Sequence, residues 1–255
     1  FPIDAVFTWV DSNDNKWLEK KNKFSNSLWD WNSRSTITER YDSNDELLYA
    51  LRSLELYAPW INHIYIVTDN QCPHWLDIDK AKDRITIIDH KDIFPHNELP
   101  CFNSSALETK LHKIPNLSEH FLYLNDDFFF GQSVLPEDFF LSNGIIRCFP
   151  SRQRVVPFDI TAESEEYIQA DKNAIDLLLR TFGNCRNEIM RHIPYPSSKK
   201  LLFEIEDAFS DNFTICAANK FRNASDIRAI SFLQYHYGWF IGKVQFSDIS
   251  HRYIS

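Results

Sequence analysis

Short apolar runs along the chain predict strands that end in polar side chains. Four runs have the β-branched and aromatic composition of buried strands, and they cover residues 3–10, 64–68, 84–89 and 121–124. Each run is followed by, or ends in, an aspartate or asparagine. Helical patterning lies between several of these runs, which is the arrangement of strands joined by crossovers. The pattern therefore predicts an α/β fold with a mostly parallel, Rossmann-like sheet flanked by helices.

Helical patterns follow capping signals at several points. Ser43 and Glu46 have the spacing of a capping box before an apolar stripe over residues 43–58, and Ser105 and Glu108 repeat that spacing before a shorter helix. The two prolines of residues 191–196 exclude a helix or a central strand there. Further helices are expected over residues 17–26, 137–141, 163–182, 201–209 (capped by Ser197 or Ser198) and 225–241, a strand over 144–149, and a polar connection over 151–157. The C-terminal portion is thus predicted to be mainly helical.

Two adjacent carboxylates, Asp126 and Asp127, lie between apolar runs in the segment FLYLNDDFFFG. Both cannot be buried without a partner, because an unpaired buried charge is unstable. Ligands of α/β sheets bind outside the carboxyl ends of strands, so the pair and Asn125 are expected at such an edge. Oxygen ligands there suit Mg²⁺ or Mn²⁺ carrying a diphosphate. An acidic turn after a strand is the alternative.

Other acidic and basic side chains are candidates for the same site. Asp11 ends the first strand, where it is either a further carboxylate of the site or a turn residue. Asp45 and Arg52 share one helix face, which is either solvated or carries an arginine over a phosphate. Lys220 and Arg222 precede the last helix, where they either bind phosphate or form a surface pair.

Two histidines are candidates for proton transfer or substrate contact. His192 lies on a proline-rich loop just before a helix, and an exposed histidine titrates near neutrality and can act as a base. His112 is four residues after Glu108, on the same helix face, where it is either a hydrogen-bonded structural residue or part of the site.

Composition narrows the classes of protein that fit. The 255 residues are 44% hydrophobic, which suffices for a sizeable core, and the net charge of −9 without a long basic run argues against a nucleic-acid partner. The glycine-rich nucleotide motifs GxGxxG and GxxxxGK[ST] do not occur. Five widely spaced cysteines without CxxC pairs indicate reduced thiols in a cytosolic protein. The sequence shows no membrane span or signal peptide, and it opens almost directly on a strand.

Four segments resemble the conserved regions of the Stealth family of sugar-1-phosphate transferases. The segments are IDAVFTWVDSND (residues 3–14), NDELLYALRSLELYAPWINHIYIVTDNQ (44–71), LPCFNSSALETKLHKIPNLSEHFLYLNDDFFFG (99–131) and NKFRNASDIRAISFLQYHY (219–237). We expect each segment to correspond to one of four conserved regions of the family. The family includes bacterial capsule polymerases and the animal N-acetylglucosamine-1-phosphotransferase α/β subunit.

The resemblance implies the reaction. A hexose-1-phosphate or HexNAc-1-phosphate passes from a UDP-sugar, such as UDP-GlcNAc, to a hydroxyl of a saccharide acceptor. A phosphodiester forms and UMP leaves, with a divalent cation, usually Mg²⁺, as cofactor. The alternatives are a metal-dependent glycosyltransferase that releases UDP and a carbohydrate-binding module without turnover.

The resemblance also implies residue roles. Asn125-Asp126-Asp127 corresponds to the essential NDD segment, His192 to the essential histidine, and Arg222 to a conserved basic position. We expect His192, Asp127 and Arg222 to be catalytic, with Asp126, Asp127 and Asp11 as metal ligands. The residues expected to contact substrate are Asp11, Asn125, Arg52, Asp45, His112 and Lys220.

The same resemblance predicts one catalytic domain over residues 1–255. Residues 1–150 would form a GT-A-like nucleotide-sugar core, and residues 151–255 a mainly helical portion that completes the active site. The composition favours a bacterial capsule or exopolysaccharide enzyme that works in the cytoplasm, with peripheral association at the inner face of the membrane.

Overall fold

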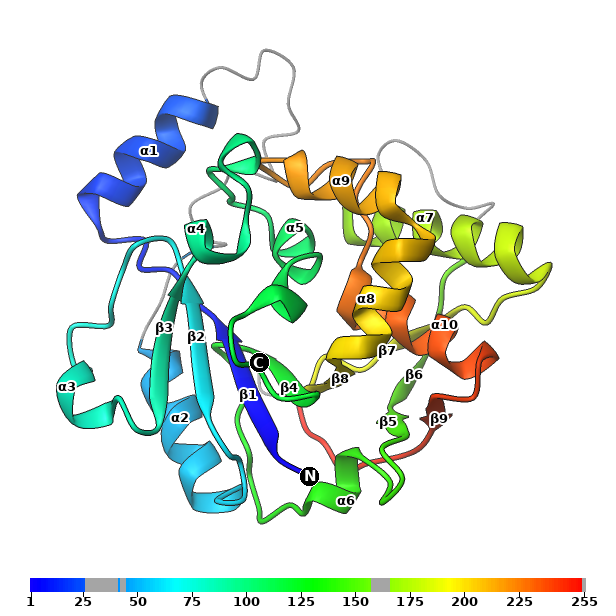
Figure 1. Ribbon diagram of the computed structural model, residues 1–255, viewed down its shortest axis with the longest axis horizontal. Helices are drawn as coiled ribbons and strands as arrows, with labels where there is room; N and C mark the ends of the chain where they lie inside the picture. Colours follow the sequence, from blue (N-terminus) through cyan, green and yellow to red (C-terminus); the bar gives the residue numbers. More distant parts are fainter. Residues whose placement is uncertain (26–40, 42–44, 157–165, 254–255) are drawn as a thin grey trace.

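A five-stranded sheet organises the computed structural model, which describes residues 1–25, 41, 45–156 and 166–253 (Figure 1). The strand order is β3-β2-β1-β4-β8; β1 to β4 are parallel and β8 is antiparallel to β4. The five strands are β1 (Ile3–Thr8), β2 (Ile64–Thr68), β3 (Ile85–Asp89), β4 (His120–Asn125) and β8 (Tyr195–Ser198). The predicted α/β fold with a mostly parallel sheet is confirmed.

The parallel strands are in register at their carboxyl ends. Thr8 of β1 pairs with Val67 on one side and with Asn125 on the other, and Thr68 of β2 pairs with Asp89. The central strands are buried almost throughout, as expected for a parallel sheet covered on both faces. The polar residues that follow these strands are therefore brought to one edge of the sheet.

Helices lie around the sheet, with a larger group on the β8 side. The longer helices are α1 (Asn15–Ser25), α2 (Glu46–Tyr57), α7 (Glu166–Phe182), α8 (Lys199–Ala208), α9 (Ser210–Ala218) and α10 (Gln234–Phe240). The short ones are α3 (Ile78–Ala81), α4 (His90–Ile93), α5 (Ser104–Glu108), α6 (Pro136–Phe139), and the 3₁₀ turns η3 (His96–Glu98) and η4 (Leu111–Lys113). In Figure 1, α7 to α10 gather beside β8, and α1 to α3 lie towards the β3 side. The mainly helical C-terminal portion is confirmed.

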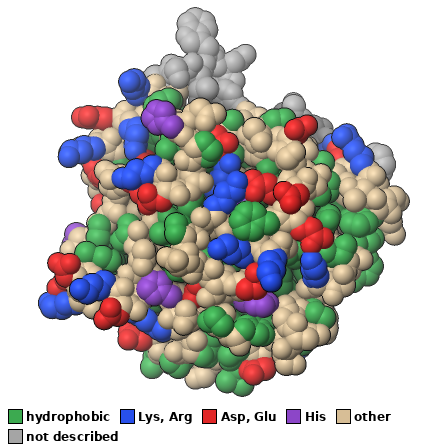
Figure 2. Space-filling view, viewed as in Figure 1, with side chains coloured by type: hydrophobic (Ala, Val, Ile, Leu, Met, Phe, Trp, Pro, Cys, Tyr) green, Lys and Arg blue, Asp and Glu red, His purple; other side chains and the backbone are tan. Residues whose placement is uncertain are grey.

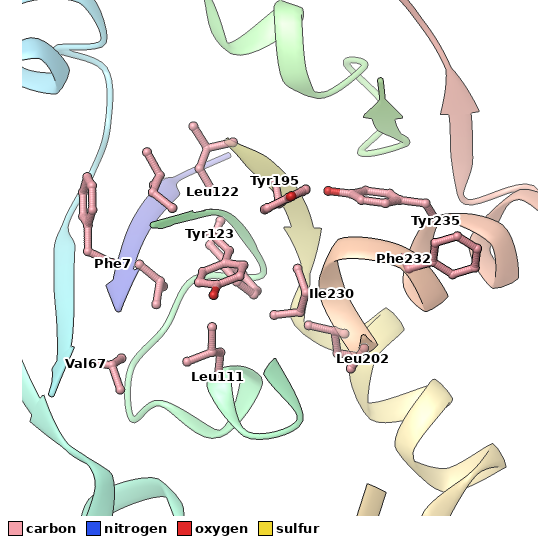
Figure 3. Close-up of a cluster of buried hydrophobic side chains, with 14 of the residues drawn as sticks. Phe7, Val67, Leu111, Leu122, Tyr123, Tyr195, Leu202, Ile230, Phe232 and Tyr235 are labelled. Atoms are coloured by element: carbon pink, nitrogen blue, oxygen red, sulfur yellow. The ribbon is translucent and has the colours of Figure 1, made fainter. Parts of the chain in front are cut away.

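The main hydrophobic core joins the sheet to the C-terminal helices. Figure 3 shows Tyr123 of β4 close to Tyr195 of β8, with Leu202 and Ile230 from the helical portion on the same side. The two tyrosine rings are stacked with centroids 5.9 Å apart. One continuous cluster of buried side chains includes residues of both portions, so the two portions share their packing.

Two small sheets extend the C-terminal portion. β5 (Ile146–Cys148) pairs in parallel with β9 (Val244–Phe246), and β6 (Pro150–Arg154) pairs in an antiparallel manner with β7 (Glu188–Met190). The predicted strand over residues 144–149 is confirmed in its central residues. The prediction of a polar connection over residues 151–157 is wrong for residues 151–154, which belong to β6. Exposed polar side chains are compatible with an edge strand when a partner strand such as β7 pairs with it.

The predicted helix caps are correct at one helix and wrong at another. Ser198 Oγ accepts a hydrogen bond from Leu201 N, 3.2 Å away, and so caps α8 as expected. The cap of α5 is Asn103, whose Oδ1 accepts from Ser105 N at 3.0 Å, so the Ser105 capping box is a wrong prediction. At α2, Ser43 lies outside the described residues. The residue before that helix, Asp45, has φ 64° and makes no side-chain cap.

The proline-rich segment contains a strand that the sequence did not predict. Pro196 lies in β8, opposite Leu122 of β4. Its carbonyl accepts hydrogen bonds from Tyr235 Oη at 3.0 Å and Gln234 Nε2 at 3.4 Å, and so faces away from the sheet. In an antiparallel ladder the N and C=O of one residue face the same side, so the missing N–H of Pro196 costs no ladder bond.

The last helix begins later than predicted. The described structure has a π-helical turn, η6 (Ala229–Leu233), before α10, where a helix over residues 225–241 was expected. Asp226 Oδ2 instead accepts from Asn223 N at 2.9 Å in a turn. The buried carboxylate of Glu108 accepts from Ile230 N and Ser231 N at 2.8 and 3.0 Å, and so binds the free donors of the first helical turn.

Candidate active site

A cavity of about 560 Å³ lies at the carboxyl ends of the parallel strands. Trp9 after β1, Val67 of β2, His90 after β3 and Asp126 after β4 all contribute to its walls. Side chains of the helical portion, among them Arg222, complete it. This is the usual place for a ligand in an open α/β sheet, and the volume suits a small molecule.

His192 lines this cavity between Asn125 and Tyr195. Asn125 Nδ2 is 3.4 Å from His192 Nε2, and Tyr195 Oη is 3.2 Å from His192 Nδ1. These contacts fit the tautomer in which Nδ1–H donates to the tyrosine oxygen and Nε2 carries the lone pair, because an amide nitrogen can only donate. His192 therefore presents a basic nitrogen to the cavity beside Asn125.

The surroundings of His192 keep it neutral. Phe128 packs edge-on against the imidazole with ring centroids 4.6 Å apart. This partial burial lowers the pKa of His192 below its ordinary value, and the charge of Asp127 opposes that change while Arg228 and Arg222 reinforce it. A neutral imidazole is the form that can accept a proton.

The acidic pair divides into a partly buried carboxylate, Asp126, and an exposed one, Asp127. Burial, together with the charges of Asp127 and of Glu46 at the start of α2, raises the pKa of Asp126 to about 7. A carboxylate whose charge is opposed by two others is stabilised by a bound cation. Glu46 was predicted as a capping residue and not as a neighbour of this pair.

Asp126 and Asp127 supply part of the ligand set that a hard divalent cation needs. The described residues contain no group of three or more His, Cys, Asp or Glu side chains arranged to hold a metal ion. Mg²⁺ usually takes one or two carboxylates and completes its shell with water and substrate phosphates. Asp126 and Asp127 match that donor set, so the residues present fit Mg²⁺ or Mn²⁺ delivered with a diphosphate.

Two guanidinium groups face the cavity from the C-terminal portion. Arg222 Nη2 donates to Ser104 Oγ at 3.1 Å. Arg228, which the sequence analysis missed, donates from Nη1 to both oxygens of buried Asp171 at 3.0 and 3.2 Å. The Asp171 charge raises the pKa of Arg228 above its usual range. Arg228 falls inside a predicted helix in the sequence, so nothing there distinguished it from a surface residue.

Asp11 and Asp45 line a separate smaller hollow and do not line the cavity that holds His192. That hollow is also lined by His74, and Trp9 contributes to both hollows. Asp11 Oδ1 accepts from Asn13 N at 2.8 Å, which is the bond of a turn residue, the alternative role for this position. The structure therefore does not bring Asp11 into one cluster with Asp126 and Asp127.

Three further predicted contact residues do not line the cavity. Arg52 lies over the Tyr49 ring on α2 at 5.6 Å. His112 is buried, and its Nε2 is 2.8 Å from Glu206 Oε2. Lys220 Nζ donates to Leu99 O at 2.9 Å. Of the predicted site residues, the cavity walls hold Asn125, Asp126, His192 and Arg222.

Glu108 anchors the wall that carries Arg228, and its removal is expected to destabilise the fold. Besides the two backbone bonds to η6, its Oε1 accepts from Ser231 Oγ at 2.6 Å. Glu108→Gln places an amide donor among these donors, so we expect the free energy of unfolding to fall by about 1–3 kcal/mol in urea titrations. The exposed Asp207→Asn serves as control, with a change within about 0.5 kcal/mol. Equal stability of Glu108→Gln and the wild type would contradict the anchoring role.

Charged and hydrophobic side chains are mixed on the described surface seen in Figure 2. On the face shown in Figure 2, Lys and Arg side chains alternate with Asp and Glu and with hydrophobic groups. Among the described residues, no helix combines the length and apolar character needed to cross a membrane. All five cysteines are free thiols.

The fold and site together define an α/β protein with a polar ligand cavity at the carboxyl edge of its sheet. Sequence comparison gives the family. The chain matches three Stealth models: Stealth protein conserved region 1 over residues 1–28, region 2 over 40–148 and region 3 over 191–238. The chain therefore belongs to the Stealth family. The expectation of one segment for each of four regions is corrected, because the segments 44–71 and 99–131 both fall in region 2 and the segment 219–237 falls in region 3.

Curated relatives are similar along the whole chain. An exopolysaccharide phosphotransferase of Streptomyces coelicolor is 42% identical over 255 residues, which is 100% of this chain and 43% of that protein. Capsular polysaccharide phosphotransferases of Neisseria meningitidis serogroup A and Haemophilus influenzae are 37% and 36% identical, over 97% and 91% of this chain. The chain covers 45% and 64% of these two proteins, so it spans roughly half the length of the relatives.

Proposed function

We propose that this protein transfers a hexose-1-phosphate or HexNAc-1-phosphate from a UDP-sugar to a saccharide hydroxyl, with release of UMP, in capsule or exopolysaccharide synthesis. The observation that carries the proposal is the neutral His192, which lies beside Asn125 in a cavity that also holds Asp126, Arg222 and Arg228. The names of the relatives, capsular and exopolysaccharide phosphotransferases, support the same class of reaction.

In this mechanism His192 Nε2 takes the proton of the acceptor hydroxyl. The hydroxyl oxygen forms a bond to the phosphorus that bears the sugar, the bond from that phosphorus to the bridging oxygen breaks, and UMP leaves with the electron pair. Tyr195 keeps the imidazole in the reactive tautomer by accepting its Nδ1–H. Such general-base help contributes about 10²–10⁴-fold to rate.

Positive groups stabilise the charge that develops on the transferring phosphoryl oxygens. Arg222 and Arg228 supply fixed positive charge from one wall, and phosphoryl transfer depends mostly on positioning and electrostatics of this kind. Asp126 and Asp127 would hold Mg²⁺, which when bound neutralises diphosphate charge. The cytoplasmic location at the membrane face stays a prediction from composition.

The released nucleotide tests this proposal. The protein is incubated with a panel of UDP-sugars, Mg²⁺ and short oligosaccharides, and the products are identified by mass spectrometry. We expect UMP and a phosphodiester-linked saccharide. Release of UDP with a glycosidic product would indicate an ordinary glycosyltransferase, and absence of any product across the panel would favour a binding module.

A further inference from the structure

Asp171 is a buried carboxylate that the proposed reaction does not use. Helix α7 buries a face that includes Ala170, Ala174 and Ile175, and Asp171 lies on that face with none of its side chain exposed. A charge in such a position is stable only with a partner. The partner is Arg228, whose Nη1 donates to Oδ2 at 3.0 Å and to Oδ1 at 3.2 Å. The ion pair joins α7 to the residue that precedes η6.

The hydrogen bonds of Arg228 hold two sides of its guanidinium group. Asp171 accepts from Nη1, and Ser231 Oγ accepts from Nε at 2.8 Å. The Ser231 hydroxyl proton goes to the buried Glu108 carboxylate, 2.6 Å away, so this oxygen can only accept from Arg228. Nη2 makes no hydrogen bond to the residues that the structure describes. Arg228 lines the cavity with 14% of its side chain exposed, so the edge at Nη2 is left for a ligand.

Helix α7 also holds the backbone that leads to Arg228. Asn173 of this helix donates from Nδ2 to Ala224 O at 2.7 Å and to Asp226 O at 2.9 Å. One helix therefore binds both the chain before Arg228 and the end of its side chain. A long and flexible arginine side chain that is fixed before the ligand arrives loses less freedom when it meets a phosphoryl group.

A purely structural ion pair is the alternative. The cost of removing two charges from water largely offsets their attraction, and neutral residues of similar volume often replace a buried pair without loss of stability. Burial raises the pKa of Asp171, and the charge of Arg228 opposes that change. An Asp171 side chain that loses its arginine can therefore take up a proton and become neutral. Stability alone thus gives little reason for an ion pair that ends at the cavity.

We propose that Asp171 is a positioning residue, which holds Arg228 in the orientation that directs Nη2 to a phosphoryl oxygen of the donor. Ser231, itself bonded to Glu108, holds the opposite side of the guanidinium. The inference rests on the proposed function, which supplies the phosphoryl group. It adds to that function a residue that does not line the cavity and acts only through Arg228.

A double-mutant cycle tests this role. The value of kcat/KM for the donor is measured from UMP release for Asp171→Asn, Arg228→Gln and the double variant. We expect Asp171→Asn to lower it about 10–100-fold, the range found for partners that orient metal ligands. Arg228→Gln should lower it about 10²–10³-fold, as for loss of a donor to the transition state. The double variant should be as slow as Arg228→Gln alone, because Asp171 acts through Arg228.

The double variant also distinguishes positioning from packing. It contains no unpaired buried charge, so a merely structural pair predicts that its kcat/KM returns to the wild-type value. That result would overturn the proposal, as would wild-type kcat/KM in a folded Asp171→Asn variant, or effects of the two substitutions that multiply. The matched control is Asp176→Asn on the same helix. Asp176 is 38% exposed and pairs with Lys172 at 2.9 Å, and its variant should keep the wild-type rate.

Added guanidinium gives a measurement that does not depend on the folding of Asp171→Asn. Arg228→Ala leaves space for the free cation, and the Asp171 carboxylate would bind it. We expect guanidinium to restore at least tenfold of the lost rate in Arg228→Ala and none in Arg228→Ala combined with Asp171→Asn. Equal rescue of both variants would overturn the role of Asp171.

Binding of inorganic pyrophosphate separates this inference from the proposed function. Calorimetry of the wild type and Asp171→Asn needs no turnover, and we expect the variant to bind pyrophosphate about tenfold more weakly, the effect of one lost charge-assisted hydrogen bond. That loss, in a protein that releases UDP or no product, would contradict the transfer reaction and support the positioning of Arg228. Release of UMP with equal pyrophosphate binding by both proteins would support the reaction and overturn the positioning role.

Discussion

A His192→Gln variant is expected to transfer sugar phosphate about 10²–10⁴ times more slowly than the wild type, at a similar KM for the donor. Glutamine keeps a polar group near the position of Nε2, which lies beside Asn125, but it cannot take a proton. The measurement is kcat from UMP release at saturating Mg²⁺. A lower kcat at an unchanged donor KM separates the chemical step from donor binding.

The pH profile gives a second readout of His192. Because the pKa of His192 lies below its ordinary value of 6.5, the neutral base is the main form at neutral pH. The wild-type rate should therefore decline as the solution is acidified and the imidazole becomes protonated, and the variant should lose that dependence. His63→Gln is the control: His63 is hydrogen bonded to Thr86 at the start of the strands, far from the carboxyl edge, and kcat should be retained. A His192→Gln variant with wild-type turnover would show that the base is another group.

An Asp126→Asn variant is expected to lose transfer activity by about 10²–10³-fold and yet to be more thermally stable than the wild type at pH 8. Asp126 has a pKa raised to about 7 in the folded protein, against 3.8 ordinarily. The folded state therefore binds more protons than the unfolded state between these values. Stability due to this group is fully present below pH 3.8 and is lost progressively as the pH rises to about 7.

Asparagine cannot ionise, so the variant avoids that loss. Melting temperatures without added metal, measured at pH 5 and pH 8, should show a larger gain at pH 8 than at pH 5, because the loss in the wild type accumulates between pH 3.8 and about 7. Mg²⁺ should raise the melting temperature of the wild type at pH 8 and have less effect on the variant. The exposed Asp83→Asn is the control and should behave as the wild type. A variant less stable than the wild type at pH 8 would contradict a destabilising charge at Asp126.

Local patterns in the sequence predicted the parallel strands and the polar residues that follow them. Asn125 and Asp126 could be placed at the carboxyl edge because the apolar run before them defines a strand. Glu108, Asp171 and Arg228 could not be assigned in this way, because their roles depend on distant parts of the chain. Glu108, for example, bonds Ser231, 123 residues away. In the sequence, the glutamate of a capping box cannot be distinguished from a glutamate that bonds a distant helix, because the position of that helix is not known.

The strand at Pro196 was missed for a related reason. A proline excludes a central strand, and whether a strand is central depends on the order of the whole sheet. Asp11 follows a strand end as expected, but its carboxylate accepts from Asn13 N and lines the smaller hollow, whereas Asp126 lines the cavity. Spacing along the chain identifies strand ends, and the turn that follows decides where each side chain lies.

The central claim is that phosphate moves together with the sugar, and an isotope label tests it most directly. A UDP-sugar labelled with ³²P in the phosphate that bears the sugar is incubated with the protein, Mg²⁺ and a saccharide acceptor. We predict that the label appears in the saccharide product and that the released UMP is unlabelled. Label found in released UDP, with an unlabelled saccharide product, would contradict the account.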